Sequence, residues 1–326
     1  MIPPLQPRSV AVVDTNALFS TLMARCRRRL PTPLLHAAQV GTLRLYAADH
    51  VYQETYEKLP RIAKAARVSP AVVRQVFEQE MLPLICFVSV PTGPPSCAEV
   101  AAVALRDPDD VPTAELVVLL APCLALSGDA DLRDSGLASP SLLAATEAVE
   151  QLAAAEGGFM LMGLATYTAG ALAWGSARGA SRLLKIPPWL VATGVVALGI
   201  AALAARDRRH NLAVKLGPFA SRTVGALAQV EQWRAGGTEQ LGIQTVASRN
   251  ESSLPAAVAG VLAGSREPML ASDVHHQVVA MSVLPEPPSL KEVRAQLTAL
   301  PMFVREDRSR WQLGRLRPPR HIKRES

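Results

Sequence analysis

The stretch VAVVDTN at residues 10–16 determines the first element of the fold. Its apolar, β-branched start predicts a short buried strand that ends at Asp14. Similar runs recur at residues 43–47, 85–90 and 123–127. Helical patterns lie between them, at residues 18–40 with a break near Pro31, then at 49–59, 69–82 and 112–121. This α/β alternation predicts a parallel sheet flanked by helices.

Acidic residues follow the predicted strands or begin the helices beside them. The pieces that carry them are VVDTN at 12–16, DHVYQE at 49–54, RDPDD at 106–110, Glu115, and SGDAD at 127–131. Taken singly, each piece is more simply a helix cap or a turn. As a set they belong to the carboxyl edge of a parallel sheet, where ligands collect. Carboxylate oxygens are preferred by Mg²⁺ and Mn²⁺, and such ions neutralise a phosphate and activate water.

In this order and spacing, the acidic pieces resemble the PIN domain over about residues 8–138. The resemblance implies a sheet wrapped by helices and a metal-dependent ribonuclease, a class that includes the toxins of bacterial toxin–antitoxin pairs. It implies that the catalytic, metal-binding acids are Asp14, Glu54, Asp110 and Asp129, with Mg²⁺ or Mn²⁺ as cofactor. Thr15 or Asn16 is expected to form hydrogen bonds around the first of these acids.

Some of these assignments have alternatives nearby. Glu57 lies one turn from Glu54, and Asp107 competes with Asp110 for the third position. Asp131 is expected to support the fourth acid. In the mechanism expected for such a site, Asp14, Asp110 and Asp129 hold one metal ion. Glu54 either shares that ion or holds a second one. A metal-activated water then attacks the phosphorus in line.

Charge is distributed unevenly along the chain. The net charge is +6, yet residues 1–150 hold 13 Lys and Arg against 16 Asp and Glu, whereas residues 151–250 hold 10 against 4. This predicts a metal-holding end and an anion-attracting end, unless the basic excess only marks membrane-flanking loops or a soluble surface. The cysteines lie too far apart for a zinc motif or a disulfide framework, which indicates reduced thiols. They are Cys26, Cys86, Cys97 and Cys123.

Two charge-free stretches, residues 157–177 and 186–205, approach the roughly 20 residues that cross a bilayer core. They predict a transmembrane helical hairpin over residues 157–205, which attaches a cytoplasmic protein to the inner membrane. The alternative is a pair of buried Ala- and Gly-rich helices in a soluble protein. Basic residues occur both in the short loop and after the second stretch, so the positive-inside rule does not select one orientation of the hairpin.

The remaining segments divide the chain further. After the PIN-like domain at 1–140, residues 141–156 predict a linker helix, and residues 206–250 predict a basic linker or a membrane-surface helix. Residues 251–316 show three helical patterns and then two short strands around a polar turn. This order is similar to winged helices of the HARE type, which are found beside nucleic-acid enzymes. Residues 317–326 form a basic tail.

The similarity to winged helices implies contacts with nucleic acid. Lys291 and Arg294 belong to the third helix, and Arg308 and Arg310 to the wing. Basic side chains at these places meet phosphates or a groove. The alternative is that this domain makes protein contacts and its charges are simply solvated.

The leading interpretation is an endoribonuclease that hydrolyses RNA phosphodiester bonds, in the role of a toxin or defence effector. Its expected partners are RNA, DNA or protein at the winged helix, the membrane, a second copy of the chain, and an inhibitor protein. Two alternatives stay open. One is a non-catalytic interaction protein that kept the PIN fold, and the other is a membrane-anchored DNA-binding regulator.

Overall fold

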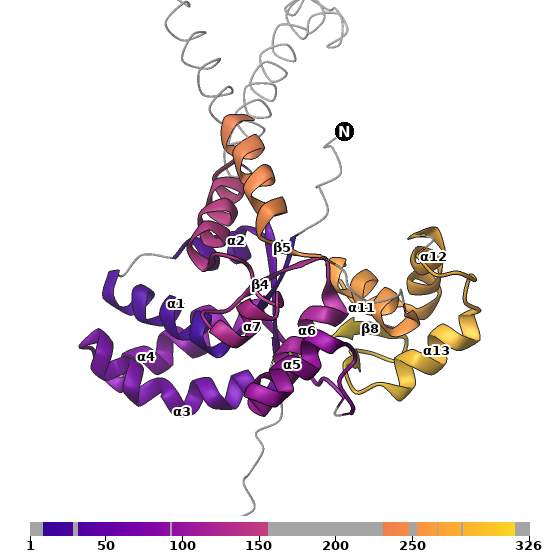
Figure 1. Cartoon of the computed structure of the whole chain (residues 1–326), viewed down its shortest axis with the longest axis horizontal. Coiled ribbons are helices and arrows are strands. Elements are labelled where there is room, and N and C mark those ends of the chain that lie inside the picture. The colour runs from indigo at the N-terminus through magenta and orange to yellow at the C-terminus, as the bar shows by residue number, and fades with distance from the viewer. Residues whose placement is uncertain are drawn as a thin grey trace, which may run out of the picture. The chain divides into compact units, whose positions relative to one another are not determined.

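The computed structural model describes residues 9–28, 32–91, 93–155, 231–247, 253–265, 267–281 and 283–316 (Figure 1). The chain divides into two compact units. The first contains residues 1–153 and 237–326, and the second contains residues 154–236. Every contact described below lies within the first unit.

The first unit is built on a five-stranded sheet with the order β3-β2-β1-β4-β5. Its strands are β1 (Ser9–Val13), β2 (Leu43–Ala48), β3 (Ile85–Val88), β4 (Cys123–Leu126) and β5 (Thr245–Val246). The first four strands are parallel, which confirms the predicted sheet. Strand β5 pairs antiparallel with the edge of β4 and comes from a region predicted as a linker. Two residues are too short a run to produce a strand pattern in the sequence.

Helices alternate with the parallel strands as the sequence predicts. They are α1 (Thr15–Arg28), α2 (Pro33–Val40), α3 (Asp49–Ala66), α4 (Pro70–Val76), α5 (Ala98–Arg106), α6 (Val111–Leu120) and α7 (Ala130–Asp134). Short turns of other helix types cover η1 (Phe77–Met81), η2 (Leu82–Leu84) and η3 (Pro108–Asp110).

Three helices differ from the prediction, and one of them, the short α7, falls where the sequence predicts no helix. Helix α3 continues past Pro60 to Ala66, because Ile62 and Ala63 beyond the proline are buried in the core and stabilise the extra turns. Helix α5 lies in a Pro-rich region for which the sequence predicts no helix. Its buried positions, Val100 and Val103, are one turn apart and face the core.

The two faces of the sheet have separate cores because side chains alternate along each strand. Ala11, Val13 and Leu45 point into a core that also holds residues of α1, α3 and α4. Val12 and Tyr46 point into the opposite core, which holds residues of α5 and α6. Both faces are therefore covered, as parallel sheets require.

The helix predicted at 141–156 is present, but neither it nor the described part of the predicted linker at 206–250 is a linker, because both contribute buried residues to the core. Residues 142–155 form a helix that buries Ala145, Val149 and Ala153 in the core. Residues 231–244 form a second helix, and a Cβ at Gly237 would lie 2.9 Å from Leu152 Cγ. The backbone N–H of Ser141 donates to Gln244 Oε1 at 2.9 Å. The two helices therefore run antiparallel and side by side (Figure 1).

The C-terminal part of the unit has the predicted three helices and two strands, with one more strand. Its elements are α11 (Leu254–Gly264), β6 (Met269–Leu270), α12 (Ala271–Met281), α13 (Leu290–Ala299), β7 (Phe303–Arg305) and β8 (Arg310–Leu313). The three strands form an antiparallel sheet in the order β6-β8-β7. Helix α13 begins with a capping box between Ser289 and Glu292.

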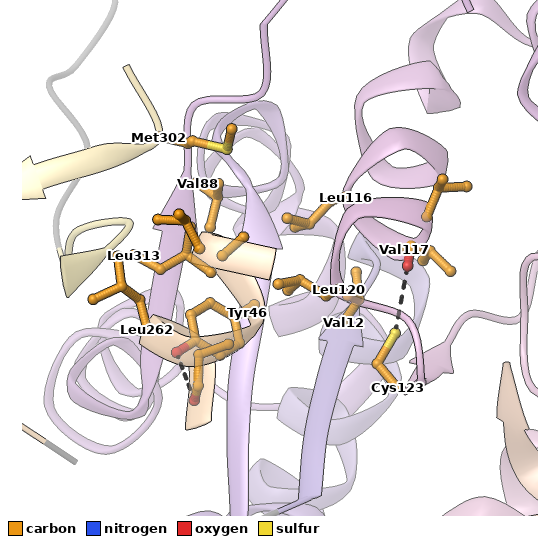
Figure 2. Close-up of a cluster of buried hydrophobic side chains, with 14 of the residues drawn as sticks. Val12, Tyr46, Val88, Leu116, Val117, Leu120, Cys123, Leu262, Met302 and Leu313 are labelled. Atoms are coloured by element: carbon orange, nitrogen blue, oxygen red, sulfur yellow. Dashed lines mark hydrogen bonds between the residues drawn. The ribbon is translucent and has the colours of Figure 1, made fainter. Parts of the chain in front are cut away.

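This C-terminal part shares one hydrophobic core with the parallel sheet. Figure 2 shows Leu262, Met302 and Leu313 beside Val12 and Val88 in a single buried cluster. Residues 251–316 therefore do not form the separate domain that the sequence predicts. The cause is that α11 is apolar over most of its surface, so it packs on the parallel sheet as well as on its own helices.

Polar contacts reinforce this junction. The hydroxyl of Tyr46 donates to the carbonyl of Ala263 at 3.2 Å, at the C-terminal end of α11 (Figure 2). The backbones of Phe87 and Arg315 exchange two hydrogen bonds of 2.8 Å. Gly314 has φ +68, and a Cβ there would lie 2.5 Å from the carbonyl oxygen of Phe87. Only glycine fits both the backbone conformation and this close approach.

Across the residues that the structure describes, no helix combines the length and the apolar character needed to cross a bilayer. The predicted membrane hairpin at 157–205 lies outside the described residues, as does the basic tail at 317–326.

Candidate metal centre

Asp14 lies at the carboxyl end of β1 and is only 3% exposed. Its Oδ1 accepts a 2.6 Å hydrogen bond from the backbone N–H of Thr15, and its Oδ2 accepts one of 2.9 Å from the hydroxyl of Ser127. Burial raises the pKa of Asp14, while these hydrogen bonds oppose the rise. Each carboxylate oxygen keeps a further lone pair, so this buried acid retains capacity for a cation.

Glu54 approaches Asp14 from helix α3. Its Oε2 accepts a 2.5 Å hydrogen bond from the hydroxyl of Thr15, which directly follows Asp14. Its Oε1 accepts a hydrogen bond from the ammonium of Lys58, one turn further along the helix. Burial raises the pKa of Glu54, but the Lys58 and Thr15 bonds outweigh it and the net pKa is lowered. The alternative acid, Glu57, is exposed and accepts instead from Gln53 at 3.2 Å.

Asp110 is the residue that directly precedes helix α6. Burial raises its pKa to about 7, and the negative charges of Asp14, Asp129, Asp107 and Glu54 add to the effect. The structure therefore brings Asp110 into the electrostatic field of the other three acids. Asp107 caps the η3 turn, accepting a 3.0 Å hydrogen bond from the backbone N–H of Asp109.

Asp129 caps helix α7 beyond the end of β4. Its Oδ1 accepts a 2.6 Å hydrogen bond from the backbone N–H of Asp131, and its own N–H donates to the hydroxyl of Ser127 at 2.9 Å. The carboxylate of Asp131 forms an ion pair with Arg106 at 3.3 Å. Because β1 and β4 are neighbours in the sheet, Asp14 and Asp129 follow adjacent strand ends. Glu115, by contrast, accepts from the backbone N–H of Ser96 at 2.8 Å and stabilises a loop.

Sequence reasoning missed several polar residues around these acids. Ser127 bridges Asp14 and the Asp129 backbone, and Lys58 neutralises Glu54. His50 lies beside Thr113, with Nε2 3.4 Å from the hydroxyl oxygen. One available signal was the spacing of His50, Glu54 and Lys58, which places all three on one face of α3. No sequence pattern indicates the contacts that come from other elements.

As the side chains lie, no three His, Cys, Asp or Glu residues within the described ranges are grouped to hold a metal ion. The charges nevertheless fit a divalent cation. Four acids raise the pKa of Asp110 and one of them, Glu54, is bound by Lys58. Hard oxygen donors with excess negative charge match Mg²⁺ or Mn²⁺, and binding such an ion relieves the repulsion among them.

The basic residues predicted to contact nucleic acid are exposed. Lys291 and Arg294 lie one turn apart on α13, while Arg308 and Arg310 lie in and after the turn that joins β7 to β8. Asp307 orders that turn by accepting hydrogen bonds of 2.8 Å from the backbone N–H groups of Ser309 and Arg310. These residues belong to the C-terminal part and not to the acid cluster.

Comparison with protein families gives one match, between residues 12–154 and the model of the PIN domain. Comparison with curated proteins and with solved structures gives no match. The matched range extends beyond the predicted boundary at 140 and takes in helix 142–155, in agreement with its buried face. The match and the parallel α/β sheet together support a PIN-like domain over residues 12–154, and the PIN fold generally belongs to nucleases dependent on divalent metal ions.

Proposed function

We propose that the protein is a metal-dependent endoribonuclease whose active site is formed by Asp14, Glu54, Asp110 and Asp129. The observation that supports it most directly is that Asp14, Asp129 and Glu54, from separate elements, all act electrostatically on Asp110, where their charges add to burial in raising its pKa to about 7. Structural carboxylates usually have Lys or Arg partners. In this cluster Lys58 pairs with Glu54, whereas Asp14 accepts from neutral donors, and both Asp14 and Asp110 have pKa values raised by burial and by neighbouring negative charge.

The chain's own residues have distinct tasks in this proposal. Asp14, Asp110 and Asp129 would hold the ion, with Glu54 completing the set once Lys58 gives up its bond. Ser127 and the Thr15 backbone fix the Asp14 carboxylate in one orientation. When bound, Mg²⁺ or Mn²⁺ neutralises the phosphate and lowers the pKa of a water molecule that serves as nucleophile.

Cleavage of labelled single-stranded RNA by the full chain, with Mn²⁺ or with EDTA, tests the proposal. Asp14→Asn/Asp129→Asn is expected to lose cutting, while Asp273→Asn, which changes an exposed acid of α12, is expected to keep it. DNA of the same sequence distinguishes an RNase from a general nuclease. A folded wild-type protein that neither cuts nor gains thermal stability from Mn²⁺ would instead support a non-catalytic PIN-fold interaction protein.

A second proposal concerns the C-terminal part, which we interpret as a winged helix that binds nucleic acid. Its order of helices and strands, with sheet order β6-β8-β7, supports this interpretation. In a winged helix, α13 would be the recognition helix and the β7–β8 turn the wing. Lys291 and Arg310 are exposed at these two places.

Charge reversal tests this second proposal. Lys291→Glu/Arg310→Glu is expected to weaken binding to RNA or duplex DNA and to reduce its dependence on salt by about two counterion contacts. Lys64→Glu/Arg74→Glu, on α3 and α4, is the matched control. If duplex DNA binds far better than RNA and the acid variants lose nothing, the DNA-binding regulator is the better description.

A further inference from the structure

His50 is a half-buried histidine that the proposed acid set does not use. It is the second residue of helix α3, one turn before Glu54. The charged groups that act on its ring are all carboxylates, those of Glu54, Asp14, Asp109 and Asp49. Burial nevertheless lowers its pKa, which favours the neutral ring.

Thr113 is the partner of this imidazole on a different element. Its hydroxyl lies 3.4 Å from His50 Nε2, and the residue is only 2% exposed. Thr113 is on the first turn of α6, three positions after Asp110. It also lines a small hollow with Asp14 and Ser127. The contact therefore connects the helix of Glu54 to the start of the helix that follows Asp110.

The second ring nitrogen of His50 has unused bonding capacity. Nδ1 is buried and has no hydrogen-bond partner among the described residues. Leaving a buried polar atom unpaired destabilises the fold, so such atoms are rare and tend to mark functional sites. A structural role alone would be served better by an apolar side chain of the same size.

We propose that His50, acting through Thr113, is a positioning residue that sets Asp110 against Glu54 so that both can bind one divalent ion. The proposal rests on the nuclease function proposed above. Metal sites depend on such outer contacts, because they orient the groups that ligate the ion. Loss of an outer contact typically lowers metal affinity 10- to 100-fold.

The test measures Mn²⁺ binding to the full chain from the electron paramagnetic resonance of free Mn²⁺, with RNA cleavage measured in parallel. His50→Ala and Thr113→Val are expected to weaken Mn²⁺ binding at least tenfold and to lower kcat, with the KM for RNA unchanged. The double variant is expected to be no worse than either single variant, because both remove the same contact. His36→Gln, at an exposed histidine of α2, is the matched control.

Two conservative variants identify the nitrogen that matters. Gln places its amide near the position of Nε2 and can reach Thr113, so His50→Gln is expected to restore most of the affinity. Asn places its amide near the position of Nδ1 and cannot reach the hydroxyl of Thr113, so His50→Asn is expected to behave as His50→Ala. Rescue by Asn and not by Gln would overturn the proposed link to Thr113.

The outcomes separate this inference from the function on which it rests. If wild type binds Mn²⁺ and cuts RNA, but folded His50→Ala and Thr113→Val bind Mn²⁺ as wild type does, the inference alone fails. If wild type neither binds Mn²⁺ nor cuts, the proposed function fails and the inference with it. Melting temperatures of all variants show which are folded. If His50→Ala does not fold, Mn²⁺ binding by Thr113→Val tests the inference instead.

Discussion

The hydroxyl of Ser127 donates a 2.9 Å hydrogen bond to the buried carboxylate of Asp14, although 113 positions separate the two residues in the chain. The same hydroxyl oxygen accepts from the backbone N–H of Asp129. This serine therefore connects the carboxyl ends of two neighbouring strands, β1 and β4, next to the acids Asp14 and Asp129 that follow them.

Replacing Ser127 with Ala is expected to leave Asp14 without one donor. The pKa of Asp14 should rise further, because burial then acts with less opposition, and Mn²⁺ must compete with a proton. We expect stability to fall by about 1–3 kcal/mol and RNA cleavage to fall about tenfold. Ser139→Ala is the control, since Ser139 is equally buried and its hydroxyl has no partner among the described residues. Equal effects of the two substitutions would contradict this interpretation.

The junction between the C-terminal part and the parallel sheet predicts a strong effect at Gly314. Gly314→Ala is expected to destabilise the unit by more than about 2 kcal/mol, because the new Cβ would meet the Phe87 carbonyl in a left-handed backbone conformation. Gly260→Ala is the control, because open space surrounds Gly260 within helix α11 and alanine favours the helix by up to about 1 kcal/mol. Chemical denaturation measures both. A single transition for the whole unit is also expected, and separate transitions would argue against a shared core.

The antiparallel helices 142–155 and 231–244 predict that the segment between them can be removed. Gly237 packs closely against Leu152, and the side chain of Gln244 accepts a hydrogen bond from the backbone of Ser141. The two helices therefore contact each other at two places along their length. Joining residue 155 to residue 231 with a Gly/Ser linker of roughly eight residues should leave the melting temperature of the first unit and its RNA cleavage unchanged. Unfolding of the shortened chain, seen by circular dichroism, would show that residues 156–230 are required for the fold.

The raised pKa of Asp110 predicts a dependence of stability on pH when metal is absent. The ordinary value is 3.8, and in the fold it is about 7. Between these values the unfolded chain releases a proton that the folded chain keeps, so this carboxyl destabilises the fold increasingly as pH rises from about 4 to about 7. In EDTA, Asp110→Asn is therefore expected to melt above wild type at about pH 7.5 and together with it at about pH 4.

Added metal should reverse that order. Wild type is expected to gain stability from Mn²⁺ at about pH 7.5, whereas Asp110→Asn should gain little because it has lost a ligand. Melting curves at both pH values, with Mn²⁺ or EDTA, provide the measurement. An Asp110→Asn variant that is less stable than wild type in EDTA at the higher pH would show that the carboxylate is stabilised by a partner.

The sequence was sufficient to predict the four parallel strands of the sheet. Strands β1 and β4 are short, apolar and followed by an acid, so both strands and the position of Asp14 could be predicted. The sequence left Glu54 and Glu57 open as alternatives for the second acid, because the contact that distinguishes them, from the Thr15 hydroxyl to Glu54, exists only in three dimensions. Asp110 and Asp107 also stayed open as alternatives for the third acid. Their positions in the sequence do not reveal which of them lies near the charges of Asp14, Asp129 and Glu54.

The larger differences concern packing. Apolar helix α11 has the composition of any buried helix, and nothing in its sequence states that its partner is a sheet more than 100 positions away. Strand β5 was missed for the opposite reason, since two residues of ordinary composition gain their strand conformation only by pairing with β4. Long-range partners of this kind are not encoded in local periodicity.

The division of the first unit into two separated segments has a consequence for how the protein is made. When residue 153 leaves the ribosome, one face of the parallel sheet still lacks α11, and the edge of β4 still lacks β5. About 100 further residues must be translated before α11 arrives, which takes roughly 5–20 s at ordinary elongation rates. For that interval the growing chain exposes the apolar surface that α11 later covers, so its biosynthesis should depend on holding chaperones, and a chain truncated before α11 should be cleared by proteolysis.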